Sequence, residues 1–445
     1  MTNRRTKDNP RQQFLDGIDS PERRRLRSLA EPCVWTECML EALHNGVKGG
    51  KWHSLIDKVW KPENLRASFR RVQLNNGAAG VDRVTCEMFA ARLDIHIDWL
   101  ERTLREERYV PQAVQRKWIP KPGRPEKRPL GIPTIRDRTV QGALRNVLEP
   151  IFEHDFSPHS YGFRPGYGCK DALRRVTELL AAGYVWVLDA DLKSYFDTIP
   201  HDRLLARIAE KVSDSRVLSL IAAYLRQPIL DELNEWTPDE GTPQGAVLSP
   251  LLANIYLNPL DHLMAETGFE MVRYADDFII LCRNRAEVEK ALALVRQWTE
   301  AAGLTLHPSK TRLVDASQRG GFDFLGYHFE RGKHWPSKKA RKQLRDRIRP
   351  LTKRTNGTSL GCIVAKLNPV LRGWYEYFKH GRPYDLPTID SWVRMRLRSI
   401  LRKRHKRKGR GRGLDHQRWQ NAFFSDLGLF SLATAHAKDC QPARR

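Results

Sequence analysis

The sequence of 445 residues lacks both long apolar runs and paired cysteines. No stretch approaches the roughly 18 uninterrupted apolar residues of a membrane span, and the first residues contain no apolar core like that of a signal peptide. The seven cysteines are odd in number and are never spaced as Cys-x-x-Cys, which argues against a disulfide framework and a structural zinc site. These absences predict a soluble, cytoplasmic protein with reduced thiols and no membrane partner.

Acidic residues are too few to balance the basic ones. The chain has 77 Lys and Arg against 52 Asp and Glu, a formal net charge of +25 and a pI near 10.0. Between Arg331 and Gly413 there are 26 Lys and Arg against 4 Asp and Glu, so this stretch alone carries +22. This excess of positive charge indicates a polyanionic partner, either nucleic acid or an anionic membrane surface. The length exceeds what one compact core requires and indicates two or three domains.

Three of the acidic residues lie at two predicted strand ends. Asp276 and Asp277 lie in Tyr274-Ala-Asp-Asp, between short apolar runs that predict a β-hairpin, and Asp191 ends an apolar strand over 184–192. Adjacent carboxylates repel each other unless a cation lies between them. Three carboxylates from two strands can hold the two Mg²⁺ ions that catalyse in-line phosphoryl transfer. The alternatives are a plain Asx-type turn and a solvent-exposed strand end.

The periodicity predicts an α+β fold built on hairpins rather than repeated β-α-β units. Helices are expected over 62–93 with a break at 75–80, and over 136–156, 201–227, 245–258 and 287–302; β structure is expected over 118–133, 184–192, 270–282 and 304–329. After Pro336 three amphipathic helices, at 337–354, 359–379 and 385–406, predict a basic bundle. The run 402–413 reads as a flexible basic linker.

Three further features point to nucleotide chemistry, each beside a plainer reading. The loop Gly241–Gly245 opens an apolar helix, so its glycines can approach a flat ligand while Gln244 hydrogen-bonds it; an ordinary helix N-terminus is the alternative. Lys121 and Arg128, on opposite arms of the 118–133 hairpin, can converge on a triphosphate, or belong to a solvated basic face. Lys310 can protonate a leaving pyrophosphate.

The order of these motifs resembles that of the group II intron-encoded reverse transcriptases and maturases. The palm-like motifs are Asp191-Leu-Lys-Ser-Tyr-Phe-Asp, Gly241-Thr-Pro-Gln-Gly, Tyr274-Ala-Asp-Asp, Leu306-His-Pro-Ser-Lys and Phe324-Leu-Gly-Tyr. The finger-like motifs are Asn75-Asn-Gly-Ala-Ala-Gly-Val-Asp, Ile119-Pro-Lys-Pro, Arg128-Pro-Leu-Gly-Ile-Pro and Ser160-Tyr-Gly-Phe-Arg-Pro. The maturase-like motif is Leu367-Asn-Pro-Val-Leu-Arg-Gly-Trp-Tyr-Glu-Tyr-Phe. The resemblance covers residues 65 to 435.

This resemblance implies a right-hand polymerase fold. Fingers and palm would combine antiparallel sheet with helices, and an all-helical thumb or maturase domain would follow them. The expected divisions are a basic N-terminal extension over 1–64, fingers over 65–180, a palm over 181–330, a thumb over 331–406, and a basic linker with a short DNA-binding segment over 407–445.

The resemblance also implies a role for each matching residue. Asp191, Asp276 and Asp277 would be catalytic and, with the Leu192 carbonyl, would hold two Mg²⁺ ions. The expected contacts to the deoxynucleoside triphosphate (dNTP) come from Lys121, Arg128, Phe196, Gln244 and Lys310. Phe196 would be the aromatic gate that excludes a 2′-hydroxyl, with Tyr195 as the alternative if the register is off by one residue.

The implied function is an RNA-directed DNA polymerase that also binds its parent group II intron RNA as a ribonucleoprotein, assists splicing and supports mobility by target-primed reverse transcription. Its partners would be an RNA template, a DNA primer or target and dNTPs, and a homodimer is compatible with this reading. No zinc endonuclease motif follows Gly413, and the ending resembles the class C members. The alternatives are a splicing-only RNA-binding maturase, a retron-like or host-adapted defence reverse transcriptase, and a chromatin-like basic protein.

Overall fold

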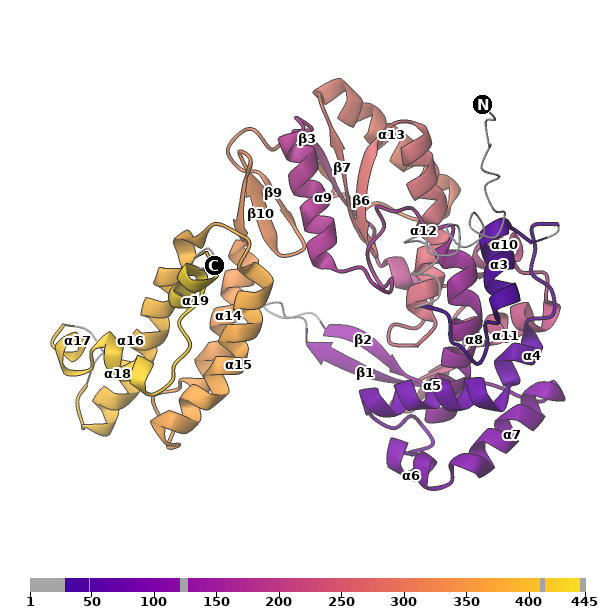
Figure 1. Cartoon of the computed structure of the whole chain (residues 1–445), viewed down its shortest axis with the longest axis horizontal. Helices are drawn as coiled ribbons and strands as arrows, with labels where there is room; N and C mark the ends of the chain where they lie inside the picture. Colours follow the sequence, from indigo (N-terminus) through magenta and orange to yellow (C-terminus); the bar gives the residue numbers. More distant parts are fainter. Residues whose placement is uncertain (1–28, 48, 121–126, 409–412, 441–445) are drawn as a thin grey trace, which may run out of the picture. The chain divides into compact units, whose positions relative to one another are not determined.

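The computed structural model describes residues 29–47, 49–120, 127–408 and 413–440. It divides into two compact units, with the boundary between Leu313 and Val314 (Figure 1). Helices and mostly antiparallel sheets are mixed in the chain, which confirms the predicted α+β class. None of the described helices is long and apolar enough to cross a bilayer.

The first unit is mainly helical around two four-stranded sheets. Its helices are α3 (Glu37–Asn45), α4 (Ile56–Trp60), α5 (Pro62–Asn75), α6 (Cys86–Ala91), α7 (Leu93–Arg105), α8 (Ile135–Glu153), α9 (Cys169–Ala181), α10 (His201–Ala209), α11 (Ser215–Leu225), α12 (Ser249–Glu266) and α13 (Arg285–Ala301), with a 3-10 turn η1 (Tyr195–Asp197). The helices expected over 62–93, 136–156 and 287–302 are present with shifted ends.

The first unit contains an N-terminal sheet and a central sheet, each of four strands. The N-terminal sheet has the order β2-β1-β4-β5, from β1 (Val114–Pro120), β2 (Lys127–Ile132), β4 (Ile229–Asp231) and β5 (Asn234–Trp236). The central sheet has the order β6-β7-β3-β8, from β3 (Trp186–Asp191), β6 (Glu270–Tyr274), β7 (Asp277–Cys282) and β8 (Arg312–Asp315). The hairpins predicted over 118–133 and 270–282 are both present as antiparallel pairs.

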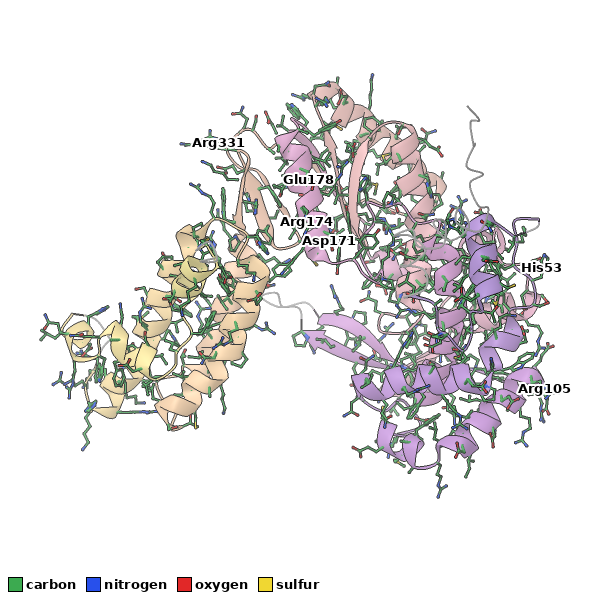
Figure 2. The ribbon with its side chains drawn as sticks, viewed as in Figure 1. His53, Arg105, Asp171, Arg174, Glu178 and Arg331 are labelled. Carbon is green, nitrogen blue, oxygen red and sulfur yellow. The ribbon has the colours of Figure 1, made fainter. Side chains whose placement is uncertain are left out.

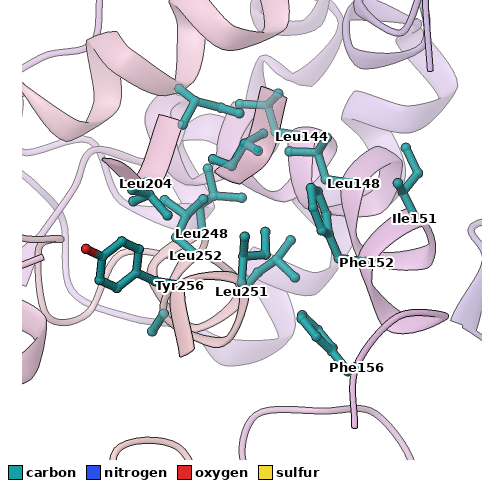
Figure 3. Packing of buried hydrophobic residues seen from close by; sticks show 14 of the residues in the cluster. Leu144, Leu148, Ile151, Phe152, Phe156, Leu204, Leu248, Leu251, Leu252 and Tyr256 are labelled. Atoms are coloured by element: carbon teal, nitrogen blue, oxygen red, sulfur yellow. The ribbon is translucent and has the colours of Figure 1, made fainter. Parts of the chain in front are cut away.

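One continuous apolar core fills the first unit. Leu144 and Leu148 of α8 face Leu251 and Leu252 of α12, as Figure 3 shows. Alternate residues of the central sheet, such as Ile280, join the same core. Because side chains alternate along a strand, the neighbouring residues of β3 and β7 point to the opposite face of the sheet. That opposite face carries the acidic residues described below.

The second unit has its own core. A three-stranded antiparallel sheet, β9 (Phe322–Phe324), β10 (Tyr327–Glu330) and β11 (Lys333–Pro336), precedes the helices α14 (Lys338–Leu351), α15 (Leu360–Phe378), α16 (Leu386–Arg404), α17 (Asp415–Arg418), α18 (Asn421–Asp426) and α19 (Leu432–Asp439), with a 3-10 turn η2 (Pro383–Asp385). The three predicted amphipathic helices are α14, α15 and α16, and their apolar faces pack on one another. Arg402, expected in a linker, instead lies in α16 and pairs with the buried Asp415 at 2.6 Å.

Two helix predictions fail for local reasons. The helix expected over 201–227 is two helices, because the Asp214 carboxylate accepts hydrogen bonds from the backbone N–H groups of Arg216 and Val217 and so begins α11. Its other oxygen accepts from Leu55 and Ile56 at the start of α4. One carboxylate therefore caps two helices, a long-range contact that helical periodicity does not reveal.

The helix expected over 245–258 begins and ends later, as α12. Gly245 has a φ of +108°, outside the helical range, and Pro250 lies in the first turn, where its missing N–H removes no hydrogen bond. At the N-terminus, the described part of the predicted extension joins the main core through residues such as Trp35 and Val59. This segment is therefore packed within the first unit rather than separate from it.

Candidate active site

The ends of β3 and β7 bring two carboxylates together. In the antiparallel ladder Asp191 lies directly opposite Asp277, and Asp189 lies opposite Ile279. Directly opposed residues in such a ladder have Cβ atoms about 4.5–5.5 Å apart. The two acids therefore share one face and one end of the central sheet, as the sequence predicts.

Asp276 occupies the two-residue turn between β6 and β7. The turn is closed by the pair Tyr274 and Asp277, and Ala275 adopts a left-handed conformation with a φ of +59°. Tight hairpin turns need a positive φ at their first central residue, a conformation that residues other than Gly adopt at an energetic cost. The surrounding structure must therefore hold this turn in place.

A buried arginine beneath the turn supplies that support. Arg273 is completely buried, and its guanidinium donates to the Ala275 carbonyl at 3.0 Å and to the Asn254 Oδ1 at 2.9 Å. Its Nε donates to the Asp261 carboxylate at 2.8 Å, which neutralises the buried charge. A buried ion pair that satisfies several hydrogen bonds fixes geometry, because breaking it leaves an unpaired charge in a dry interior.

The segment before α9 closes the back of the turn. Asn254 donates to the Gly162 carbonyl at 2.8 Å, and the Tyr161 N–H donates to the Arg273 carbonyl at 2.8 Å. A Cβ at Gly162 would lie 2.1 Å from the Ala275 nitrogen, so only glycine allows this approach. We call Asn254, Asp261, Arg273 and Gly162 the turn support.

Opposing effects act on the pKa of Asp276. Burial raises the pKa of the Asp276 carboxyl and the nearby Asp191 charge raises it too, while backbone hydrogen bonding and the charges of Arg128 and Arg273 act in the opposite direction. The Lys310 ammonium lies 2.6 Å from the Asp191 Oδ2. Asp276 therefore lies close enough to Asp191 for the two charges to interact.

The carboxylates offer the hard oxygen ligands that divalent ions such as Mg²⁺ prefer. Among the residues that the structure describes, no three His, Cys, Asp or Glu side chains are gathered closely enough to hold a metal ion as they stand. Lys310 is the cation beside Asp191 here, so metal binding requires that carboxylate to exchange its partner. Leu192, expected to offer its carbonyl, is buried and bridged to Leu306.

The aromatic residues of η1 point in different directions. Tyr195 is 2% exposed and its hydroxyl donates to the Ala253 carbonyl at 2.6 Å; burial raises its pKa well above the ordinary range. Phe196 is half-buried and lines a cavity of about 570 Å³. Of the two candidate gate residues, only Phe196 therefore faces open space.

The glycine loop lies against the chain itself. A Cβ at Gly241 would meet the Asp197 backbone at 2.8 Å, and one at Gly245 would meet the Gly131 carbonyl at 2.5 Å. The sequence predicts that these glycines let a ligand come close, whereas in the structure other backbone segments of the protein occupy that space. Gln244 lines the same cavity, and its Nε2 donates to the Asp197 carboxylate at 3.3 Å.

The basic candidates are only partly placed. Lys121 lies outside the described residues. Arg128 is exposed on β2, opposite Ile119, and its charge acts on Asp276. The structure therefore pairs Asp191 with Asp277 beside the Asp276 turn, with Lys310 on Asp191 and the Arg128 charge acting on Asp276. Phe196 and Gln244 line the cavity of about 570 Å³.

The turn support was missed, although the sequence carries a signal for it. Asn254, Asn258 and Asp261 recur at i, i+4 and i+7 in an otherwise apolar helix, which places three polar side chains on one face of α12. All three are buried. A polar stripe on a buried helix indicates a hydrogen-bonded network, because unpaired polar groups are costly there.

A sheet that presents paired acids beside a hairpin turn is the arrangement expected of palm-type nucleotide polymerases. Two family models match the chain: "Reverse transcriptase (RNA-dependent DNA polymerase)" over residues 119–329 and "Group II intron, maturase-specific domain" over residues 341–419. The chain belongs to the family of reverse transcriptases that carry a group II intron maturase domain.

Curated relatives agree with this assignment. The chain is 33% identical to Protein YkfC of Escherichia coli over 318 residues, covering 62% of this chain and 83% of that protein. It is 34% identical to the group II intron-encoded protein LtrA of Lactococcus lactis, covering 49% of this chain and 36% of LtrA. A putative COX1/OXI3 intron 1 protein of Saccharomyces cerevisiae is 26% identical, covering 81% of this chain and 49% of that protein. The chain thus spans half or less of the length of the latter two.

Proposed function

We propose that the chain extends a DNA primer on an RNA template, with Asp191, Asp276 and Asp277 as the catalytic carboxylates. The reaction is attack of the primer 3′-hydroxyl on the dNTP α-phosphate with release of pyrophosphate. The observation that carries this proposal is the register of the central sheet, which pairs Asp191 with Asp277 beside the Asp276 turn.

Two Mg²⁺ ions are the proposed cofactors, held by Asp191, Asp276, Asp277 and the Leu192 carbonyl. When bound, they would lower the pKa of the attacking hydroxyl and stabilise the leaving pyrophosphate. The turn support holds Asp276 at the sheet end in a fixed conformation. Lys310, which pairs with Asp191 in the structure, would donate a proton to the leaving group after that pair opens.

The remaining proposed contacts orient the nucleotide. Arg128 and Lys121 would bind its phosphates, and Phe196 would contact the deoxyribose and exclude a 2′-hydroxyl. Gln244 would line the pocket from the glycine loop. The influence of the Arg128 charge on Asp276 supports this division of labour, as does the partial exposure of Phe196 beside the buried Tyr195.

A second role, in splicing of a parent group II intron, is favoured by the charge of the second unit. The stretch Arg331–Gly413, with its net +22, would grip RNA phosphates, and splicing assistance requires RNA-binding surfaces rather than acids. We propose the divisions 65–180 for fingers, 181–330 for palm and 331–406 for thumb, and action in the cytoplasm on intron RNA and DNA targets. A homodimer is also proposed, and the molar mass of the purified full chain in solution tests it.

The test compares two isosteric substitutions in primer extension on an RNA template with Mg²⁺ and dNTPs. Asp276→Asn should abolish extension and leave RNA affinity unchanged, because it removes one charge from the acid cluster. Asp171→Asn is the matched control: Asp171 lies on α9 in an exposed ion pair with Arg174 (Figure 2). If the Asp276→Asn protein still makes cDNA, the metal assignment is wrong.

The partner RNA is tested by sequencing the nucleic acid that copurifies with the full chain. A group II intron is the expected result. A short structured non-coding RNA from another locus would favour the retron-like alternative, and intron RNA without cDNA synthesis would favour a splicing-only maturase.

A further inference from the structure

The cavity of about 570 Å³ beside Phe196 has one wall made by a single face of the N-terminal sheet. Arg116 lies opposite Gly131, and Ile229 lies opposite both Val114 and Trp236. Directly paired residues point to the same side of a sheet, so all of these residues face the cavity, and each of them lines it. The opposite wall is the chain from Thr237 to Gln244.

This sheet wall is a flat aromatic surface. The Arg116 guanidinium lies over the Trp236 ring, 4.5 Å from its centroid, and Trp236 remains 37% exposed. A planar guanidinium stacked on an indole offers a surface on which any nucleobase can stack. The wall therefore favours a flat ligand over a compact or branched one.

The charge of the cavity is the reverse of that of the chain. Its lining includes the carboxylates of Asp197, Asp239 and Glu240, and Arg116 is the one cationic side chain among the lining residues. A lining with this excess of negative charge repels phosphate and accepts hydrogen bonds from amino or hydroxyl groups. In a protein of net charge +25 this excludes a triphosphate from the cavity and favours the base end of a nucleotide.

A buried hydroxyl in the lining has an unused hydrogen-bonding capacity. Thr242 is 2% exposed, and its Oγ1 has no hydrogen-bond partner among the residues that the structure describes. Its backbone N–H, in contrast, donates to the Phe196 carbonyl at 2.6 Å. Buried hydroxyls are normally paired, so this group points to a ligand with a polar edge.

We propose that this cavity binds the base of the template nucleotide that lies immediately 5′ of the one being copied. The inference rests on the proposed polymerase function. Phe196 and Gln244 line the cavity and are also the proposed contacts to the incoming nucleotide, so a base held in the cavity would lie beside that nucleotide. The unpaired base stacks on Trp236 and Arg116, and its polar edge meets Thr242 and the carboxylates.

The experiment uses the full chain, a DNA primer and an RNA template whose overhang is two nucleotides long. One template is intact, and the other has an abasic residue at the second overhang position. Template affinity is measured by fluorescence anisotropy, and incorporation of one nucleotide is measured on the same complexes. For the wild-type protein the abasic residue should weaken binding about 5- to 150-fold, the range expected for one base stacked on an aromatic side chain.

Three variants separate stacking in the cavity from general binding. Trp236→Ala should weaken binding of the intact template by the same factor and become indifferent to the abasic residue, whereas Trp236→Phe should retain discrimination. Trp99→Ala is the matched control: Trp99 of α7 also carries a stacked arginine, with the Arg136 guanidinium 4.7 Å from its ring centroid, and neither residue lines the cavity. Trp99→Ala should discriminate as the wild type does.

The inference is overturned if wild-type binding ignores the abasic residue, or if Trp236→Ala still discriminates between the templates. Failure of the polymerase proposal gives a different result, since the wild type would then bind template without incorporating a nucleotide. Affinity reports on the cavity and incorporation reports on the carboxylates.

Discussion

Replacing Asn254 by Ala would remove the side chain that joins the acidic turn to the segment behind it. Asn254 accepts a hydrogen bond from Arg273 at 2.9 Å and donates one to the Gly162 carbonyl at 2.8 Å, in a site closed to solvent. The Arg273–Asp261 ion pair would remain. The substitution therefore loosens the support of the turn without leaving a buried charge unpaired.

The expected effects differ in size for folding and for activity. Each buried polar group left unpaired costs about 1–3 kcal/mol, so the two lost bonds should lower the free energy of unfolding by roughly 2–6 kcal/mol. The Asp276 turn, with Ala275 at a positive φ, would lose part of the network that holds it. A displacement of about 1 Å at reacting groups costs on the order of 100-fold in rate, and kcat should fall by that order.

Asn258→Ala provides the matched control for this prediction. Asn258 lies one turn further along α12, is also buried, and bonds Asp155 and the Ser157 N–H, away from the acidic turn. Urea unfolding and steady-state primer extension, measured on both variants, separate stability from catalysis. Both variants should be destabilised, and only Asn254→Ala should lose kcat with KM for dNTP nearly unchanged. Equal kcat values for the two variants would refute the positioning role.

Three further perturbations test other parts of the structure. Gly162→Ala should abolish primer extension because its Cβ would lie 2.1 Å from the Ala275 nitrogen, whereas Gly168→Ala, whose nearest neighbour is 3.9 Å away, should retain activity. Asp214→Ala should lower the free energy of unfolding by roughly 1–4 kcal/mol, since one carboxylate caps two helices; a loss below that range in urea melts would contradict the double cap. Lys403→Gln, in a depression lined only by cationic side chains, should reduce the salt slope of log RNA affinity by about 0.7–0.9 in filter binding, and an unchanged slope would exclude a phosphate contact there.

The part of the site that could be predicted depends on short-range pattern. Asp191, Asp276 and Asp277 each follow or precede an apolar run, so local periodicity places them at strand ends, and a hairpin brings two of them together automatically. Their meeting with the third acid required only that β3 pair with β7, which the structure confirms. The metal-binding and nucleotide-binding roles of these residues stay predictions.

The parts that were missed are held by contacts between distant segments. Arg273 reads as an ordinary strand residue, and only the fold reveals that α12 supplies its counter-charge and that Gly162 lies behind its turn. Asp214 likewise acts on α4 from about 160 residues away in sequence, and the break that it creates was read as continuous helix. Periodicity shows which face of a helix or strand is apolar. It carries no information on which remote group will pair with a buried polar side chain or backbone group.

The glycine loop has a mechanical consequence. The Gly131 N–H on β2 donates to the Gln244 carbonyl at 2.7 Å, and the Thr242 N–H in the same loop donates to Phe196. A displacement of the β1–β2 hairpin would therefore be transmitted to the Phe196 backbone through these two hydrogen bonds and the loop between them. Movement of that hairpin and movement of Phe196 would therefore be coupled through the loop 242–244.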